Sequence, residues 1–235
     1  MARERITDQP AFLLHSVPYS ETSLVLDLLT RDHGRMAALA KGAKRPRSAL
    51  RAVLLQFQPI LVAYSGRNEL RTLTGAEWQG GLDAPRGAGL MSAFYLNELL
   101  MRLMAREDPH PAVFDGYEQA LREIAANCPI ETTLRKFEWL LLRETGVAPD
   151  LSCDSDDRPI DPAARYSWMP AGGFLLTNAG DQTVSGQTLI SLSNHQFDSE
   201  DVRQQAKQLT RRILNHCLDG YKLSTRTIMQ NLQKL

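Results

Sequence analysis

The sequence lacks the features that mark secreted, disulfide-stabilised and membrane proteins. Its three cysteines, Cys128, Cys153 and Cys217, are an odd number without paired spacing, so we expect reduced thiols. No apolar run approaches the length of a membrane span, and charged residues interrupt the first ten positions, where a signal peptide needs an apolar stretch. We therefore expect a cytoplasmic protein with no membrane partner.

Catalytic and metal-binding signatures are also missing. The chain has no glycine-rich phosphate loop ending in Lys-Ser/Thr, no His-Glu-x-x-His and no Gly-x-Ser-x-Gly. The one carboxylate cluster is Asp154, Asp156, Asp157 and Asp161, but Arg158 stands where a calcium loop needs an oxygen ligand. We expect no catalytic residue, cofactor, metal ion or small-molecule substrate, and keep a nuclease built on this cluster as an alternative.

Charge is balanced over the whole chain but not along it. The formal net charge is zero, from 27 basic and 27 acidic residues. Residues 1–71 hold 11 Lys and Arg against 6 Asp and Glu, residues 72–197 hold 9 against 17, and residues 198–235 hold 7 against 4. Binding to a polyanion should therefore be confined to the two ends.

The first eighty positions follow the two-residue period of short strands. Strands are predicted at residues 12–17, 23–30, 34–42, 59–65 and 69–78. Five short antiparallel strands within about seventy residues fit an OB-type barrel better than a sandwich, which needs about seven.

A glycine-rich stretch at residues 80–89 ends this pattern, and the apolar period then changes to that of helices. Helices are predicted at residues 91–104, 111–127, 129–145 and 199–219. Residues 147–188, with strand-like pieces at 165–169 and 174–177, are expected to form an irregular insert. The predicted fold is α+β: an OB-type domain over residues 1–80 and a mainly helical domain over residues 81–235.

The most informative stretch is residues 34–51, which contains six cations and no acidic residue: Arg35, Lys41, Lys44, Arg45, Arg47 and Arg51. Gly42 and Pro46 predict a loop between two strands here. A cation near a phosphate releases a counterion, so the cluster predicts a DNA-binding surface, to which we add Arg67 and Arg71. The alternative is a solvated loop whose charge only aids solubility.

Three aromatic residues near these cations have rings able to stack on bases: Tyr19, Tyr64 and Trp78. We expect each of them to be buried in the core. Binding should then depend on backbone charge, with little sequence preference.

Two further sets of residues are candidates in the helical region. Arg135, Lys136 and Trp139 fall within one helical turn, and a cation beside a ring suits an acidic, hydrophobic peptide tail. From spacing alone, a buried Trp139 and an Arg135–Glu131 pair are the better interpretation. The second set is a basic surface near the C-terminus: Lys207, Arg211, Arg212, Lys222 and Arg226.

Several short blocks of sequence are specific enough to suggest a family. They are Phe12-Leu13-Leu14-His15-Ser16, Pro18-Tyr19-Ser20-Glu21-Thr22-Ser23-Leu24, Asp27-Leu28-Leu29-Thr30, His33-Gly34-Arg35, Ala40-Lys41-Gly42-Ala43, Tyr95-Leu96-Asn97-Glu98-Leu99-Leu100, Leu134-Arg135-Lys136-Phe137-Glu138 and Lys222-Leu223-Ser224-Thr225-Arg226. Together they resemble the RecO recombination-mediator family of bacterial DNA repair proteins over nearly the whole chain.

The resemblance implies an OB-fold followed by a helical domain, in agreement with the periodicities. It also implies binding of single- and double-stranded DNA, annealing of complementary strands, and loading of RecA onto DNA coated by single-strand-binding protein, close to the nucleoid. The implied partners are RecR and the acidic C-terminal tail of single-strand-binding protein. Arg35, Lys41, Lys44 and Arg45 become DNA-contact candidates, and the Arg135–Trp139 turn becomes the candidate for docking the tail.

The chain departs from the family pattern in the insert, where many relatives carry a four-cysteine zinc site. Only Cys153 stands in such a place, with Asp156 at the spacing of a second ligand and Leu175 and Asn178 near the other pair. A four-ligand structural zinc site cannot be built from these residues, so we expect no zinc.

A second function stays open from the sequence. Under this alternative, the chain is an adapter whose main task is to dock proteins, and its contact with DNA is incidental. Charge reversal at Lys44 and Arg45 separates this alternative from the mediator hypothesis.

Overall fold

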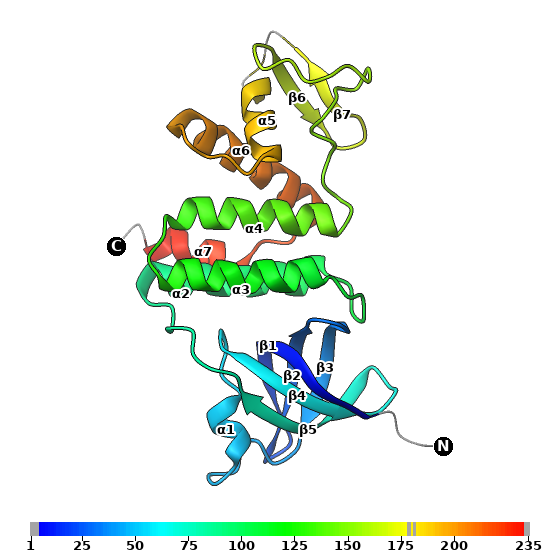
Figure 1. Ribbon diagram of the computed structural model, residues 1–235, viewed down its shortest axis with the longest axis vertical. Helices are drawn as coiled ribbons and strands as arrows, with labels where there is room; N and C mark the ends of the chain where they lie inside the picture. The colour runs from blue at the N-terminus through cyan, green and yellow to red at the C-terminus, as the bar shows by residue number, and fades with distance from the viewer. Residues whose placement is uncertain (1–4, 178–179, 181, 233–235) are drawn as a thin grey trace. The chain divides into compact units, whose positions relative to one another are not determined.

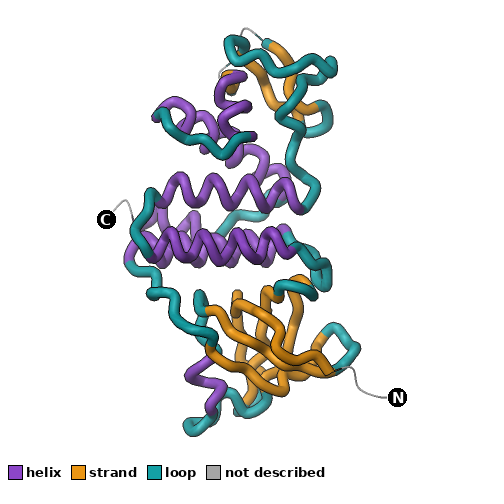
Figure 2. The backbone as a smooth tube through the Cα atoms, viewed as in Figure 1, coloured by secondary structure: helices purple, strands orange, loops and turns teal. Residues whose placement is uncertain are grey.

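The computed structural model describes residues 5–177, 180 and 182–232 (Figures 1 and 2). The chain forms two compact units. The first comprises the described parts of residues 1–128 and 223–235, and the second those of residues 129–222. The sequence predicted a domain boundary at residue 80, where strands give way to helices. This position lies inside the first unit, and the boundary stays a prediction.

Five strands of the first unit close a barrel in the order β1-β2-β3-β5-β4. They are β1 (Arg5–Tyr19), β2 (Ser23–Thr30), β3 (Gly34–Ala40), β4 (Pro59–Ser65) and β5 (Leu70–Trp78). The predicted α+β fold with an N-terminal OB-type barrel is confirmed. The prediction of only antiparallel pairs was wrong for β3 and β5, which pair in parallel. In a ring of five strands, directions cannot alternate all the way round, so one pair must be parallel.

Alternate residues of the strands fill the barrel, as the two-residue period predicts. Leu26 and Leu28 of β2, Met36 and Ala38 of β3 and Val62 of β4 all belong to one buried cluster. Strand β1 begins earlier than predicted because its polar first half pairs with β4 and its apolar second half with β2. Polar edge residues give no clear period, so the sequence did not show this extension.

Two helices of the first unit, α2 (Gly87–Leu103) and α3 (Pro111–Ala125), share a core with β1. The ring of Phe12 packs edge-on against Tyr117, and the Tyr117 hydroxyl donates to Asn97 Oδ1 at 2.5 Å. Asn97 Nδ2 in turn donates to the Leu14 carbonyl at 2.8 Å. Burial raises the pKa of Tyr117, so this hydroxyl remains a donor. The contacts join the helices to the barrel.

A buried carboxylate, Glu98, attaches the last helix, α7 (Ser224–Leu232), to α2. Its Oε1 accepts from the Ser224 amide at 2.8 Å, and its Oε2 accepts from the amide and the hydroxyl of Thr225 at 3.0 and 2.6 Å. A carboxylate satisfies the free N–H groups at a helix N-terminus and interacts favourably with the helix dipole. The sequence did not predict α7, which returns the end of the chain to the first unit.

Replacing this carboxylate by an amide, Glu98→Gln, should lower the free energy of unfolding by about 1–3 kcal/mol, since one buried donor loses its acceptor. Amide hydrogen exchange at Ser224 and Thr225 should also become faster. The control is Glu118→Gln, which removes only an exposed ion pair with Arg122 and should cost about 0.5 kcal/mol or less. Equal stabilities of the two variants would show that Glu98 does not hold α7.

The second unit contains α4 (Ile130–Glu144), α5 (Gly186–Ser193) and α6 (Glu200–Cys217), and a sheet in the order β7-β6-β8. Its strands are β6 (Arg165–Met169), β7 (Gly173–Leu176) and β8 (Thr183–Ser185). The insert therefore contains the two predicted strands, and β8 and the start of α5 in addition.

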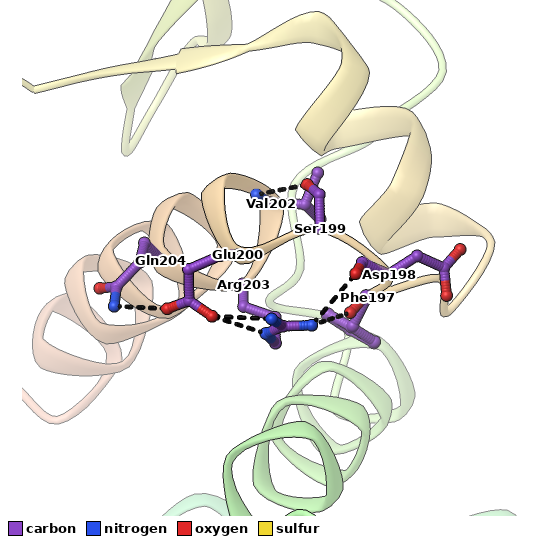
Figure 3. Close-up of polar contacts among 7 residues, drawn as sticks. All are labelled: Phe197, Asp198, Ser199, Glu200, Val202, Arg203 and Gln204. Carbon is purple, nitrogen blue, oxygen red and sulfur yellow. Dashed lines mark hydrogen bonds and ion pairs between the residues drawn. The ribbon is translucent and has the colours of Figure 1, made fainter.

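The start of α6 shows why the prediction of this helix was right. Ser199 Oγ accepts from the Val202 amide at 3.1 Å, and Glu200 in the first turn accepts from Arg203 and Gln204 (Figure 3). Arg203 also donates to the Phe197 carbonyl at 2.9 Å, which ties the preceding loop to the helix. No helix among the described residues is long and apolar enough to cross a membrane.

Candidate nucleic-acid interface

Residues 41–51, called the basic segment below, follow β3 and lie at one end of the barrel. The Arg45 amide donates to the Gly42 carbonyl at 3.1 Å, and the Ser48 amide donates to the Arg45 carbonyl at 3.0 Å. The segment then enters a short helix, α1 (Ala49–Val53), at the lower end of the barrel in Figure 1. The sequence indicated only a loop here, because one helical turn is too short to show a 3.6-residue period.

Apolar side chains fix the backbone of this segment to the barrel. Ala43 is fully buried in the barrel cluster, and Leu50, Val53 and Leu54 pack against the same cluster. The Lys44 amide also donates to the Thr22 carbonyl of the β1–β2 turn at 2.9 Å. The segment is therefore held in one shape with its polar side chains on the outside.

Five cations of the basic segment are exposed to solvent: Lys41, Lys44, Arg45, Arg47 and Arg51. Within the described part of the chain, none of these five side chains pairs with a carboxylate. No carboxylate of the described residues therefore neutralises their positive charge, and a phosphate chain can reach it.

Two predicted DNA contacts, Arg35 and Arg71, are instead partly buried in ion pairs. Arg35 lies 3.3 Å from Asp27 Oδ2, which Arg106 also approaches at 3.4 Å. Burial lowers the pKa of Arg35 and raises the pKa of Asp27, although their mutual attraction opposes both shifts. Arg71 pairs with Glu107 at 2.9 Å. The Arg71–Glu107 and Arg106–Asp27 pairs hold the α2–α3 connection against the barrel, whereas the Arg35–Asp27 pair lies within the barrel.

The strand geometry separates these cations from the basic segment. Arg35 lies near the start of β3 and Lys41 just after its end, about 20 Å apart at about 3.3 Å per residue. Arg67 lies in the β4–β5 turn, at the end where β4 finishes. Of the eight predicted contacts, the structure therefore brings together the five of the basic segment and not Arg35, Arg67 and Arg71.

The three aromatic residues near the cations, all of which we expected to be buried, differ in their exposure to solvent. Tyr64 is buried, as expected. The expectation of burial was wrong for Tyr19 and Trp78, which are 53% and 58% exposed. Both occupy the last position of a strand, where the barrel core ends.

The structure gives the C-terminal cations different surroundings, and a second basic surface built from them stays a prediction. Lys207 lies 2.6 Å from Glu131, and Arg212 donates to the Gln182 carbonyl at 2.7 Å and lies over the Trp168 ring. Arg226 belongs to the first compact unit, beside Tyr95, whereas the other four belong to the second. Arg211 and Lys222 are exposed.

The predicted docking turn on α4 is mostly occupied by the protein's own contacts. Trp139 is buried, as its spacing indicated. Arg135 pairs with buried Glu138 at 2.5 Å, rather than with Glu131 as the spacing suggested. Of the three residues, Lys136 alone is exposed.

Carboxylates of the acidic cluster in the insert accept hydrogen bonds from backbone amides and so stabilise the turns of the insert. Asp154 Oδ1 accepts from the amides of Asp156 and Arg158 at 2.9 and 3.0 Å, and Asp161 Oδ1 accepts from the Ala163 amide at 2.9 Å. The described residues contain no group of three or more side chains placed to hold a metal ion.

The zinc pattern of the family has no matching set of donors here. Cys153 lies beside Asp150, Leu175 offers no ligand atom, and Asn178 lies outside the described residues. The donors present do not fit a structural zinc ion.

Comparison with known proteins gives consistent matches over the whole chain. Residues 1–81 match the family model described as Recombination protein O N terminal, and residues 86–226 match Recombination protein O C terminal. A protein of Ralstonia nicotianae named DNA repair protein RecO is 48% identical over 100% of this chain and 88% of its own length. Proteins of the same name from Burkholderia lata and Aromatoleum aromaticum are 48% and 44% identical, over 98% and 99% of this chain and 84% and 99% of their own lengths.

Proposed function

Because the chain belongs to the RecO family of DNA repair proteins, we propose that it is a non-enzymatic recombination mediator whose basic segment binds the sugar-phosphate backbone of DNA. One observation supports this assignment above all others. Five exposed cations without carboxylate partners among the described residues stand on a segment that buried apolar residues fix to the barrel.

The proposed mechanism is electrostatic. Each cation that meets a phosphate releases a condensed counterion, and this release drives binding to single or double strands. Two complementary strands held near the same positive surface repel each other less, so their bases find one another sooner. No covalent bond forms or breaks, and the annealing of strands follows from charge neutralisation.

Loading of RecA onto DNA coated by single-strand-binding protein is the proposed role in the cell, with RecR as the second partner. The acidic C-terminal tail of single-strand-binding protein needs a cation and an apolar surface. Lys136 is the exposed member of the predicted docking turn and is proposed to meet a tail carboxylate. Arg211 and Lys222 are proposed as accessory cations.

A salt titration of the full chain with fluorescently labelled single-stranded DNA tests the phosphate contacts directly. Five contacts predict a slope of about −3.5 for log affinity against log salt concentration, since each contributes about −0.7 on a single strand. Affinity should then fall about a hundredfold between 50 and 200 mM salt. A slope near zero would be incompatible with binding through phosphates.

Two controls separate the alternative functions. A protein-docking adapter binds the tail peptide of single-strand-binding protein but shows weak DNA binding with little dependence on salt. A nuclease releases shorter products when labelled DNA is incubated with the chain and magnesium. Such products would overturn the non-enzymatic assignment.

A further inference from the structure

The topology of the barrel brings two exposed aromatic residues to the same end as the basic segment. Tyr19 is paired with Ser23, and the next residue, Leu24, is paired with Ala40 at the end of β3. Strands β3 and β5 run in parallel, so Trp78 at the end of β5 also lies at this end. In Figure 1, this is the lower end of the barrel, where α1 lies.

Tyr19 is linked to the basic segment by a backbone hydrogen bond. The β1–β2 turn that begins at Tyr19 is tight, with Ser20 in the left-handed region at φ 54°, and its Thr22 carbonyl accepts from the Lys44 amide at 2.9 Å. The turn and the segment therefore form one surface element. About half of the Tyr19 surface is open to solvent.

The ring of Trp78 is held by its edge. Its Nε1 donates to Gln58 Oε1 at 3.3 Å, which fixes the indole while 58% of the residue remains exposed. Gly81 passes close to the indole, and a Cβ there would come within 3.4 Å of Trp78 Cζ2. An open ring held in this way needs no rearrangement to meet a flat partner.

Exposed aromatic rings beside cations allow a protein to bind single-stranded DNA more tightly than double-stranded DNA. The base faces of a duplex are stacked on each other, so only unpaired bases offer a face to an aromatic side chain. Phosphate contacts are common to both forms of DNA. We propose that Tyr19 stacks on an unpaired base and, with Trp78, makes the basic segment prefer single-stranded DNA. This inference depends on the proposed function, because the cations must place the strand beside the rings.

The test compares three probes with the full-length Tyr19→Ala variant: a single-stranded oligothymidylate, a base-free sugar-phosphate oligomer of equal length, and a duplex. Loss of one stacking contact should weaken oligothymidylate binding about tenfold. Affinities for the base-free oligomer and the duplex should stay within about twofold, with the salt slope unchanged. Tyr19→Phe should retain wild-type affinity for all three probes, because stacking requires the ring and not the hydroxyl.

Val17→Ala is the matched control, since Val17 is exposed near the end of the same strand but has no ring. It should bind all three probes like the wild type. An equal loss on all three probes in Tyr19→Ala, or no loss on any, would overturn the stacking role. A different result would refute the proposed function itself. In that case the wild-type chain would bind every probe with a salt slope near zero.

Discussion

Reversing two charges of the basic segment, Lys44→Glu together with Arg45→Glu, should weaken binding to single-stranded DNA by about a hundredfold at 0.1 M salt. Removal of two phosphate contacts alone accounts for about 25-fold at this salt concentration, and repulsion by the new carboxylates adds the remainder. The salt slope should become less steep by about 1.4. Fluorescence anisotropy measures the affinity, and the rate of annealing of complementary oligonucleotides should fall with it.

The double variant should keep its fold, because both side chains are exposed and neither pairs with a carboxylate in the described part of the structure. The matched control is Arg143→Glu with Arg158→Glu, which makes the same change in net charge at two exposed ion pairs. Such pairs contribute about 0–1 kcal/mol each, so this control should also fold. Its DNA affinity should stay within about threefold of the wild type. Unchanged annealing by the Lys44 and Arg45 variant would favour the adapter instead.

The strands of the barrel were predictable because each element repeats its pattern over several residues. The alternation of β2 and β3 is set by which side chains enter the core, and this can be seen in the local sequence. The parallel pairing of β3 with β5 was not visible, since it depends on how five strands close. Neither was α7, whose position depends on Glu98, a residue more than a hundred positions earlier.

The candidate site was predictable only in part, for a related reason. Local composition identified a cluster of cations but did not show which of them the fold pairs with carboxylates. Arg35 and Arg71 find their partners Asp27 and Glu107 through the barrel and the α2–α3 connection. The exposure of Tyr19 was missed because its position at the end of β1 follows from the pairing of β1 with β2.

The close contact of β3 with the α2–α3 connection predicts the largest effect on stability, at Gly34→Ala. Gly34 has φ +68°, and an added Cβ would overlap the backbone of Asp108. A left-handed conformation costs an L-residue about 1–2 kcal/mol. The overlap also displaces the connection, whose Glu107 amide donates to the Arg35 carbonyl at 2.9 Å. We expect a loss of about 3 kcal/mol or more in the free energy of unfolding, measured by denaturant titration.

Gly146→Ala separates the two causes of this loss, because Gly146 has a similar φ of +74° but open space where an added Cβ would lie. This control should lose only about 1–2 kcal/mol. If both variants lost the same amount, the contact with Asp108 would contribute nothing. Gly34 begins β3 and the basic segment follows its end, so the fraction of Gly34→Ala that remains folded should bind DNA like the wild type. Loss of binding by that folded fraction would mean that phosphate recognition extends along β3 to Arg35, beyond the five exposed cations.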